Sequence, residues 1–89
     1  MIHTTHNAIT NHTFVANRVI SITSPRLVET LKRFTEIWAI TVVFDNKSAI
    51  DIGFEFKDLG DRDRKTFMDM ITREHIRLLA AVNKATQHN

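Results

Sequence analysis

The sequence predicts an α+β fold with two layers, in which two helices pack on one face of a three-stranded sheet in the order β-α-β-β-α. Between Trp38 and Phe56, apolar residues twice fall on every second position, which is typical of strands with one buried face. After Pro25 and again after Asp61, apolar residues recur at helical spacing instead. The change of period between these segments predicts the fold class.

The N-terminal residues divide into a polar stretch and a strand. Residues 1–12 are polar and show no periodicity, so we expect them to be flexible. Residues 13–22 are rich in β-branched and apolar side chains, which predicts the first strand. The remaining length suits one hydrophobic core, so residues 13–89 are expected to form a single small domain.

A first helix is predicted over residues 25–38. Ser24 is a good N-cap, and Pro25 suits the first helical position because the N–H that it lacks has no partner there. The apolar stripe of this helix is Leu27, Leu31, Phe34 and Trp38.

The hairpin that follows has a register that can be argued from Asp51. A two-residue turn at Asn46 and Lys47 would direct Asp51 into the core, because a slip of one residue moves every side chain to the other face. We therefore expect a loop of three residues (46–48) or five, with Phe44 opposite Ile50. The same register places Val42 opposite Ile52, Ile40 opposite Phe54, and Trp38 opposite Phe56.

A long C-terminal helix is predicted from Asp61, as N-cap, to about Thr86. At 1.5 Å per residue it would span about 37 Å, whereas a strand of eight residues spans about 27 Å. The expected strand order is 1-3-2, a truncated ferredoxin-like arrangement. This order leaves the first strand with an open edge, which is a surface for association.

The last turns of this helix are apolar on more than one side. If Leu78 and Val82 face the sheet, then Ile76 and Leu79 point elsewhere, and small domains seldom expose such a stripe to water. One interpretation is a contact with the first helix inside the monomer, and the other is a homodimer. The predicted interaction residues are Ile76, Leu79, Ala80 and Asn83.

Basic residues on the same helix support an alternative function, the binding of a nucleotide or nucleic acid. The isoelectric point is about 9.4, but residues 1–57 and 58–89 each hold six basic and five acidic side chains, and a nucleic-acid binder usually has a clear basic patch. This alternative is therefore not favoured. Its predicted phosphate contacts are Arg62, Arg64, Lys65, Arg73 and Arg77.

No grouping of residues predicts catalysis, a cofactor or a metal. His3, His6 and His12 lie in the polar N-terminal stretch, which is expected to be too poorly ordered to hold a metal. His75 beside Glu74 is expected to have a structural role, with a histidine-dependent hydrolase or metal site as the least favoured alternative. The chain has two glycines, too few for a glycine-rich phosphate loop.

The segment from Ile52 to Ile71 resembles the C-terminal end of PilZ domains, which sense cyclic di-GMP. The shared features are Gly53 followed by Phe56, an acidic-Leu turn at Asp58 and Leu59, and a charged helix start. The resemblance implies a β-barrel with a terminal helix. The ligand motifs of that family are R-x-x-x-R, which does not occur ahead of the hairpin, and D/N-x-S-x-x-G, whose final glycine is replaced by Asp51 in the segment that starts at Asn46. No binding residues are therefore transferred.

The absence of cysteine is typical of a reducing compartment, and no stretch has the length of a membrane span or the layout of a signal peptide. We therefore expect a cytoplasmic protein. The function hypothesis is a non-enzymatic regulator or inhibitor that acts by protein–protein interaction as a homodimer, without cofactors and without a membrane partner.

Overall fold

The predicted hairpin forms the middle of the structure. The computed structural model describes residues 2–31, 35–57 and 61–87, with side chains from 64 to 85 in the last segment. Strand β5 (Thr35–Phe44) pairs antiparallel with β6 (Ala49–Phe56). The even-numbered side chains face the core, and the buried ones are Ile40, Val42, Ile52, Phe54 and Phe56. Asp51 is exposed, so the predicted assignment of the two faces is confirmed.

The register of this hairpin differs from the predicted one by two residues. Val42 lies opposite Ile50, and Trp38 lies opposite Phe54. The reason is the position of the loop, which is Asp45–Lys47 rather than 46–48. Lys47 donates its backbone N–H to the Phe44 carbonyl at 2.9 Å and has a φ of 69°, which completes a tight turn followed by a left-handed residue. A shift of two residues leaves each side chain on its predicted face.

The predicted first helix is wrong. Arg26–Leu31 forms strand β4, which pairs antiparallel with the N-terminal half of β5. Residues 35–38, the predicted end of the helix, belong to β5, whose partners on both sides require an extended backbone. Pairing with neighbouring strands therefore outweighs the helical spacing of the leucines, and the β-branched residues Val28, Thr30 and Thr35 suit a strand. Phe34 lies outside the described residues.

The strand order also corrects the prediction, because the first strand of the sheet lies beside β5 and not beside β6. Strand β3 (Val19–Ile22) pairs with the C-terminal half of β5, and β4 pairs with its N-terminal half along the same edge. Strand β6 occupies the other edge. The sheet thus has four strands and not three, because the segment predicted as the first helix adds β4, and a break before Pro25 separates β4 from β3 along the same edge. Proline has no N–H to donate to a ladder.

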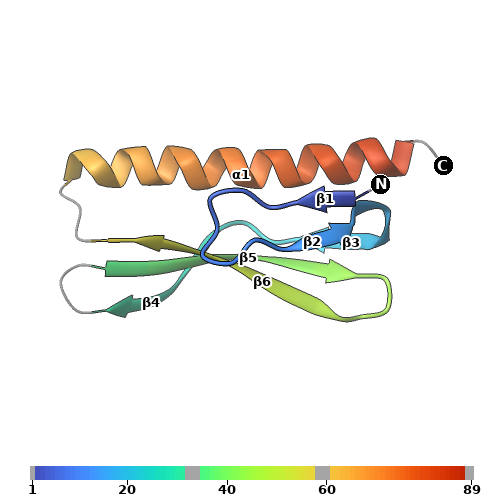
Figure 1. Cartoon of the computed structure of the whole chain (residues 1–89), viewed down its shortest axis with the longest axis horizontal. Coiled ribbons are helices and arrows are strands. Elements are labelled where there is room, and N and C mark those ends of the chain that lie inside the picture. The colour runs from blue at the N-terminus through green and yellow to red at the C-terminus, as the bar shows by residue number, and fades with distance from the viewer. Residues whose placement is uncertain (1, 32–34, 58–60, 88–89) are drawn as a thin grey trace.

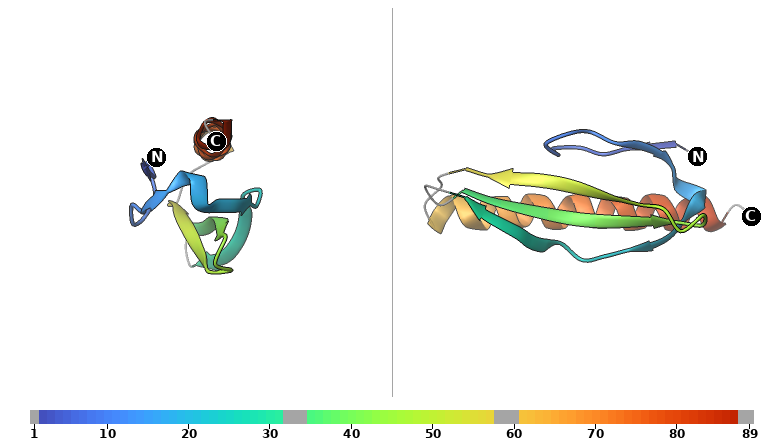
Figure 2. Two further views of the ribbon diagram at one scale, coloured as in Figure 1. Left: turned by 90° about the vertical axis from the view of Figure 1, so that its right-hand side faces the viewer. Right: turned by 90° about the horizontal axis from the view of Figure 1, so that it is seen from below.

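A second, two-stranded sheet forms at the N-terminus. Strand β1 (Ile2–Thr4) pairs with β2 (Thr13–Val15), and a 3-10 helix, η1 (Ala16–Arg18), leads from β2 into β3. The predicted strand over residues 13–22 is therefore two strands with a turn between them. This N-terminal hairpin (residues 2–15) lies beside α1 on the side of β6, whereas β4 lies on the opposite side of the sheet (Figure 2).

One long helix, α1 (Asp61–Gln87), covers one face of the four-stranded sheet, and its extent agrees with the predicted C-terminal helix. It runs along the whole length of the sheet, and the molecule measures 46 × 22 × 18 Å (Figure 1). Its buried face repeats at helical spacing through Phe67, Ile71, Glu74, Leu78 and Ala85. Within the described residues α1 is the only α-helix, and it is not apolar enough to cross a membrane.

Candidate interaction surfaces

The described residues enclose no pocket, and they contain no group of three His, Asp or Glu side chains that could hold a metal ion. Three exposed regions carry the distinctive side chains of the molecule. They are the open face of the sheet, the edge formed by β4, and the outer face of α1.

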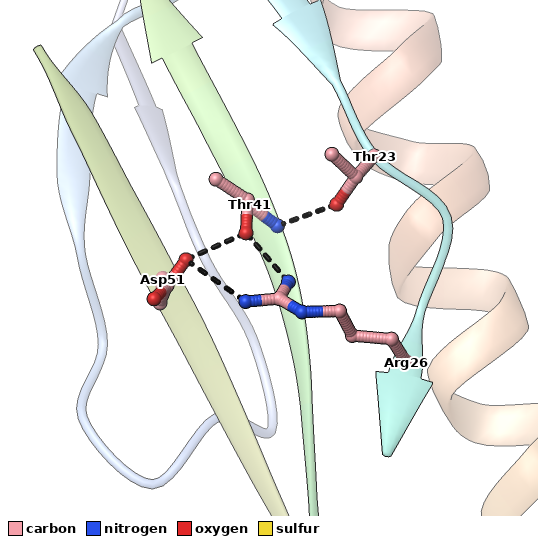
Figure 3. A network of polar contacts seen from close by, with 4 residues as sticks. All are labelled: Thr23, Arg26, Thr41 and Asp51. Atoms are coloured by element: carbon pink, nitrogen blue, oxygen red, sulfur yellow. Dashed lines mark hydrogen bonds and ion pairs between the residues drawn. The ribbon is translucent and has the colours of Figure 1, made fainter. Parts of the chain in front are cut away.

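A polar network crosses the open face of the sheet (Figure 3). The Thr41 hydroxyl on β5 accepts a hydrogen bond from Arg26 Nη1 at 2.6 Å and donates one to Asp51 Oδ1 on β6, also at 2.6 Å. Arg26 Nη2 lies 3.6 Å from the same Asp51 oxygen. The network therefore joins β4, β5 and β6 on the face that α1 does not cover.

Thr23 connects this network to the break between β3 and β4. The Thr41 N–H donates to the Thr23 hydroxyl at 3.0 Å, and the Thr23 N–H donates to the Thr41 carbonyl at 2.9 Å. The Thr23 side chain thus provides the acceptor that a backbone carbonyl provides in a regular ladder. The break before Pro25 is closed by one side chain, so β3 and β4 stay on the same edge of β5.

Strand β4 is the most exposed element of the sheet. All six of its residues are exposed, including Leu27 at 47%, Val28 at 53% and Leu31 at 42%. Its only strand partner among the described residues is β5, so its outer edge has no ladder. An apolar edge strand of this kind is a template for pairing with another chain.

The opposite edge of the sheet is covered. The Ile9 N–H donates to the Gly53 carbonyl of β6 at 2.8 Å, and a Cβ atom at Gly53 would lie 3.4 Å from the Ile9 side chain. The N-terminal hairpin therefore lies against β6, and the two edges of the sheet differ. One is covered by the chain itself, and the other is open.

The outer face of α1 carries the interaction residues predicted from the sequence. Ile76 is 57% exposed and Leu79 is 39% exposed, whereas Leu78 is buried. Ala80 and Asn83 are also exposed. The structure therefore brings these four residues to the exposed side of the helix, as the phase set by Leu78 implies. Their role in association stays a prediction.

The basic residues of the alternative interpretation do not form one patch. Arg64 Nη1 lies 3.0 Å from Glu36 Oε1, and Arg77 Nη1 lies 2.9 Å from Glu74 Oε1, so both guanidinium groups have a carboxylate partner. The two arginines are separated by about 20 Å along the helix. Lys65 and Arg73 are exposed, and the side chain of Arg62 lies outside the described residues.

Glu74, considered from the sequence only as the neighbour of His75, is a buried acid. It is 4% exposed and accepts hydrogen bonds from Asn7 Nδ2 at 3.2 Å and from Arg77 Nη1 at 2.9 Å. Position 74 follows Phe67 and Ile71 at helical spacing, and this spacing is the signal that could have placed it on the buried face. His75, the neighbouring candidate, is half-buried.

The N-terminal histidines lie in different surroundings. His3 packs against Phe14 with ring centroids 5.6 Å apart. Burial and the nearby His6 lower the pKa of His3 below its usual value of 6.5, while Glu74 opposes this shift. His6 is exposed, and the His12 N–H donates to the buried Thr5 hydroxyl at 2.8 Å. These residues serve the packing of the N-terminal hairpin.

This geometry defines a small α+β protein with one open, apolar sheet edge. Comparisons with protein-family models, with curated proteins and with solved structures found no match to this chain. The resemblance of residues 52–71 to PilZ domains therefore stays a prediction.

Proposed function

We propose that this chain is a non-enzymatic regulatory or inhibitory protein of the cytoplasm that acts by protein–protein interaction as a homodimer. The observation that supports this most strongly is β4, in which Leu27, Val28 and Leu31 are all exposed, on an edge that no other described strand pairs with. Burying three such side chains is favourable by about 25 cal/mol for each Å² of apolar surface removed from water. Association with a second molecule through β4 would bury these three side chains.

The outer face of α1 supports the same function independently. Ile76 and Leu79 are large apolar side chains on a helix whose opposite face already fills the core. Two apolar surfaces on one small protein are typical of a molecule that makes more than one contact. A dimer that also binds a regulated partner uses both.

The test is the mass of the protein in solution. We expect sedimentation velocity to show a dimer at about 100 µM and dissociation on dilution, because the stability of a dimer depends on protomer concentration. Leu27→Lys, Leu79→Asp or both should shift the protein towards monomer. Ile2→Lys and Thr66→Asp are the matched controls, since both residues are exposed and belong neither to β4 nor to the predicted interaction residues of α1.

The homodimer is contradicted if the wild type is monomeric at about 200 µM, a concentration at which specific dimers are well populated. It is also contradicted if the controls weaken association as much as the two surface variants do. Circular dichroism of each variant separates loss of association from loss of folding.

The alternative, a nucleotide or nucleic-acid binder, has weaker support because Arg64 and Arg77 are paired with Glu36 and Glu74. It predicts retention on heparin that falls steeply as salt rises, since phosphate contacts release counterions. Arg73→Glu should then abolish retention. Elution at low salt, unchanged in that variant, would favour the protein-interaction function.

A further inference from the structure

We propose that two copies of this chain pair through β4, antiparallel and about a two-fold axis, with Leu27 opposite Leu27 of the second copy. This inference rests on the proposed homodimer and names its interface. The starting observation is the difference between the two sheet edges. Ile9 covers β6, whereas β4 has no partner on its outer side among the described residues.

The direction of the backbone groups identifies the residues that are available for pairing. Thr41 exchanges its hydrogen bonds with Thr23 on the β3–β4 side, and alternation along β5 gives Ala39 and Ile37 the same direction. Their partners Arg26 and Glu29 therefore point their N–H and C=O groups at β5. Leu27, opposite Trp38, and Thr30, opposite Glu36, point their backbone groups outwards.

The side chains of β4 alternate between the open face of the sheet and the face covered by α1. Arg26 and Glu29 lie opposite Ala39 and Ile37 and so project from the open face, while Leu27 lies opposite Trp38 and projects from the helix face. A bulge at Val28 brings Arg26 and Glu29 to the same face although they are three residues apart. These positions decide the register.

Charge then selects one register. In the bulge, Val28 and Glu29 together oppose one residue of a partner strand. With this bulge kept in each copy, an axis at Leu27 places Arg26 opposite Glu29 of the second copy and, by symmetry, Glu29 opposite Arg26 of the second copy. An axis at Glu29 would place two carboxylates together, and an axis at Arg26 would place two guanidinium groups together, which is destabilising for residues directly opposite. An axis at Thr30, the other residue with outward backbone groups, would place Glu29 opposite Leu31 and form no ion pair between them. The register at Leu27 is therefore the one that the charges favour.

The opposite charges of Arg26 and Glu29 favour a second copy of this chain, rather than another extended peptide, as the partner of β4. A two-fold interface uses the same surface twice, so it requires self-complementarity. A strand that carries Arg26 and Glu29 on one face, on either side of Leu27, meets this requirement. The result is a continuous sheet across two molecules, with a helix of each copy on the same side.

The experiment is a charge exchange across the axis. Arg26→Glu and Glu29→Arg are made separately and together, and their masses allow native mass spectrometry to distinguish homodimers from heterodimers in a mixture. Each single variant should self-associate at least about tenfold more weakly, because like charges then meet twice. An equimolar mixture of the two should form a heterodimer, and the double variant should recover the homodimer.

Arg26 also contacts Thr41 and Asp51 within its own chain, so Thr41→Val is the matched control. It removes the hydroxyl of the network and changes no residue of β4, and it should dimerise as the wild type does. Leu27→Lys should dissociate the dimer, because the two leucines face each other at the axis.

The outcomes separate this inference from the proposed function. If the wild type dimerises, but the mixture gives no heterodimer and only Leu79→Asp dissociates it, the β4 interface is wrong and the homodimer stands. If the wild type is monomeric at about 200 µM, both fail. Heterodimer formation from the two single variants supports both.

Discussion

Asn7 donates a hydrogen bond to the buried carboxylate of Glu74, 67 residues further along the chain, at 3.2 Å. Asn7 has a φ of 59°, a left-handed conformation that asparagine adopts more readily than most residues. This contact and the Ile9 hydrogen bond to Gly53 join the N-terminal hairpin to α1 and to β6. These polar contacts, together with the packing of Phe14 against Phe44, attach the hairpin to the rest of the protein on the side opposite β4.

We expect Glu74→Ala to destabilise the protein by about 0.5–1.5 kcal/mol, the usual contribution of one hydrogen bond, because it removes the acceptor of the bond that joins Asn7 to α1. Asp69→Ala is the control, since Asp69 is an exposed acid on the same helix. Urea unfolding measures the free energy. Hydrogen exchange should show faster exchange of the Ile9 amide in Glu74→Ala only. Equal destabilisation by the two variants would contradict a structural role for the buried carboxylate.

The free energy of unfolding should fall as the pH drops below 6.5, because His3 then begins to favour the unfolded state. Burial, and then His6, hold the pKa of His3 below 6.5 in the folded state. Below pH 6.5 the unfolded chain therefore binds a proton at His3 more readily than the folded protein does. The contribution of His3 to the free energy of unfolding is thus fully present above pH 6.5 and declines below it. Urea midpoints at pH 7.5 and pH 5.5 measure the loss. His3→Gln should reduce the difference between them, and an unchanged difference would contradict the assignment.

Glu36 should give an acid-dependent signal in tryptophan fluorescence. Its carboxylate accepts a hydrogen bond from Trp38 Nε1 at 3.1 Å and is paired with Arg64, and these contacts, in that order, lower the pKa of Glu36 below 4.5. Its stabilising effect is therefore present above pH 4.5 and is lost as the pH falls through the lowered pKa. Trp38 is the only tryptophan, so its emission reports this titration directly.

Two variants test the assignment of this signal. Glu36→Gln should abolish the acid-dependent change in emission, because the amide does not titrate in that range. Arg64→Gln should move the midpoint to higher pH, since it removes one of the two contacts that favour the charged carboxylate. An acid transition that persists unchanged in Glu36→Gln would show that another group affects Trp38.

The parts of the fold that follow from local alternation could be predicted from the sequence, and the parts that depend on pairing could not. The burial of Ile52 and the exposure of Asp51 depend only on alternation along one strand. The register was displaced by two residues because it depends on which residues form the loop. Residues 26–31 were assigned to a helix because Leu27 and Leu31 satisfy helical spacing, and only the partner β5 decides between the two structures.

The same distinction applies to the candidate interaction surfaces, some of which follow from local spacing and some from strand pairing. The exposure of Ile76 and Leu79 could be predicted, because Leu78 sets the phase of the helix. The open edge at β4 could not be predicted once the segment was interpreted as a helix. The burial of Glu74 could have been inferred, because its spacing from Phe67 and Ile71 places it on the buried face of α1. Glu74 is stabilised there by Asn7, from a segment that was expected to be flexible.

Thr23 offers the sharpest test of how β3 and β4 stay on one edge. Its hydroxyl accepts the Thr41 N–H at 3.0 Å at the break before Pro25. We expect Thr23→Val to destabilise the protein by about 0.5–1.5 kcal/mol, the usual contribution of one hydrogen bond, because valine has the same shape without the acceptor. Thr23→Ser keeps the acceptor and is the control. Faster hydrogen exchange of the Thr41 amide in Thr23→Val, but not in Thr23→Ser, would show that this side chain closes the break, whereas equal exchange in the two variants would assign closure to the backbone contacts alone.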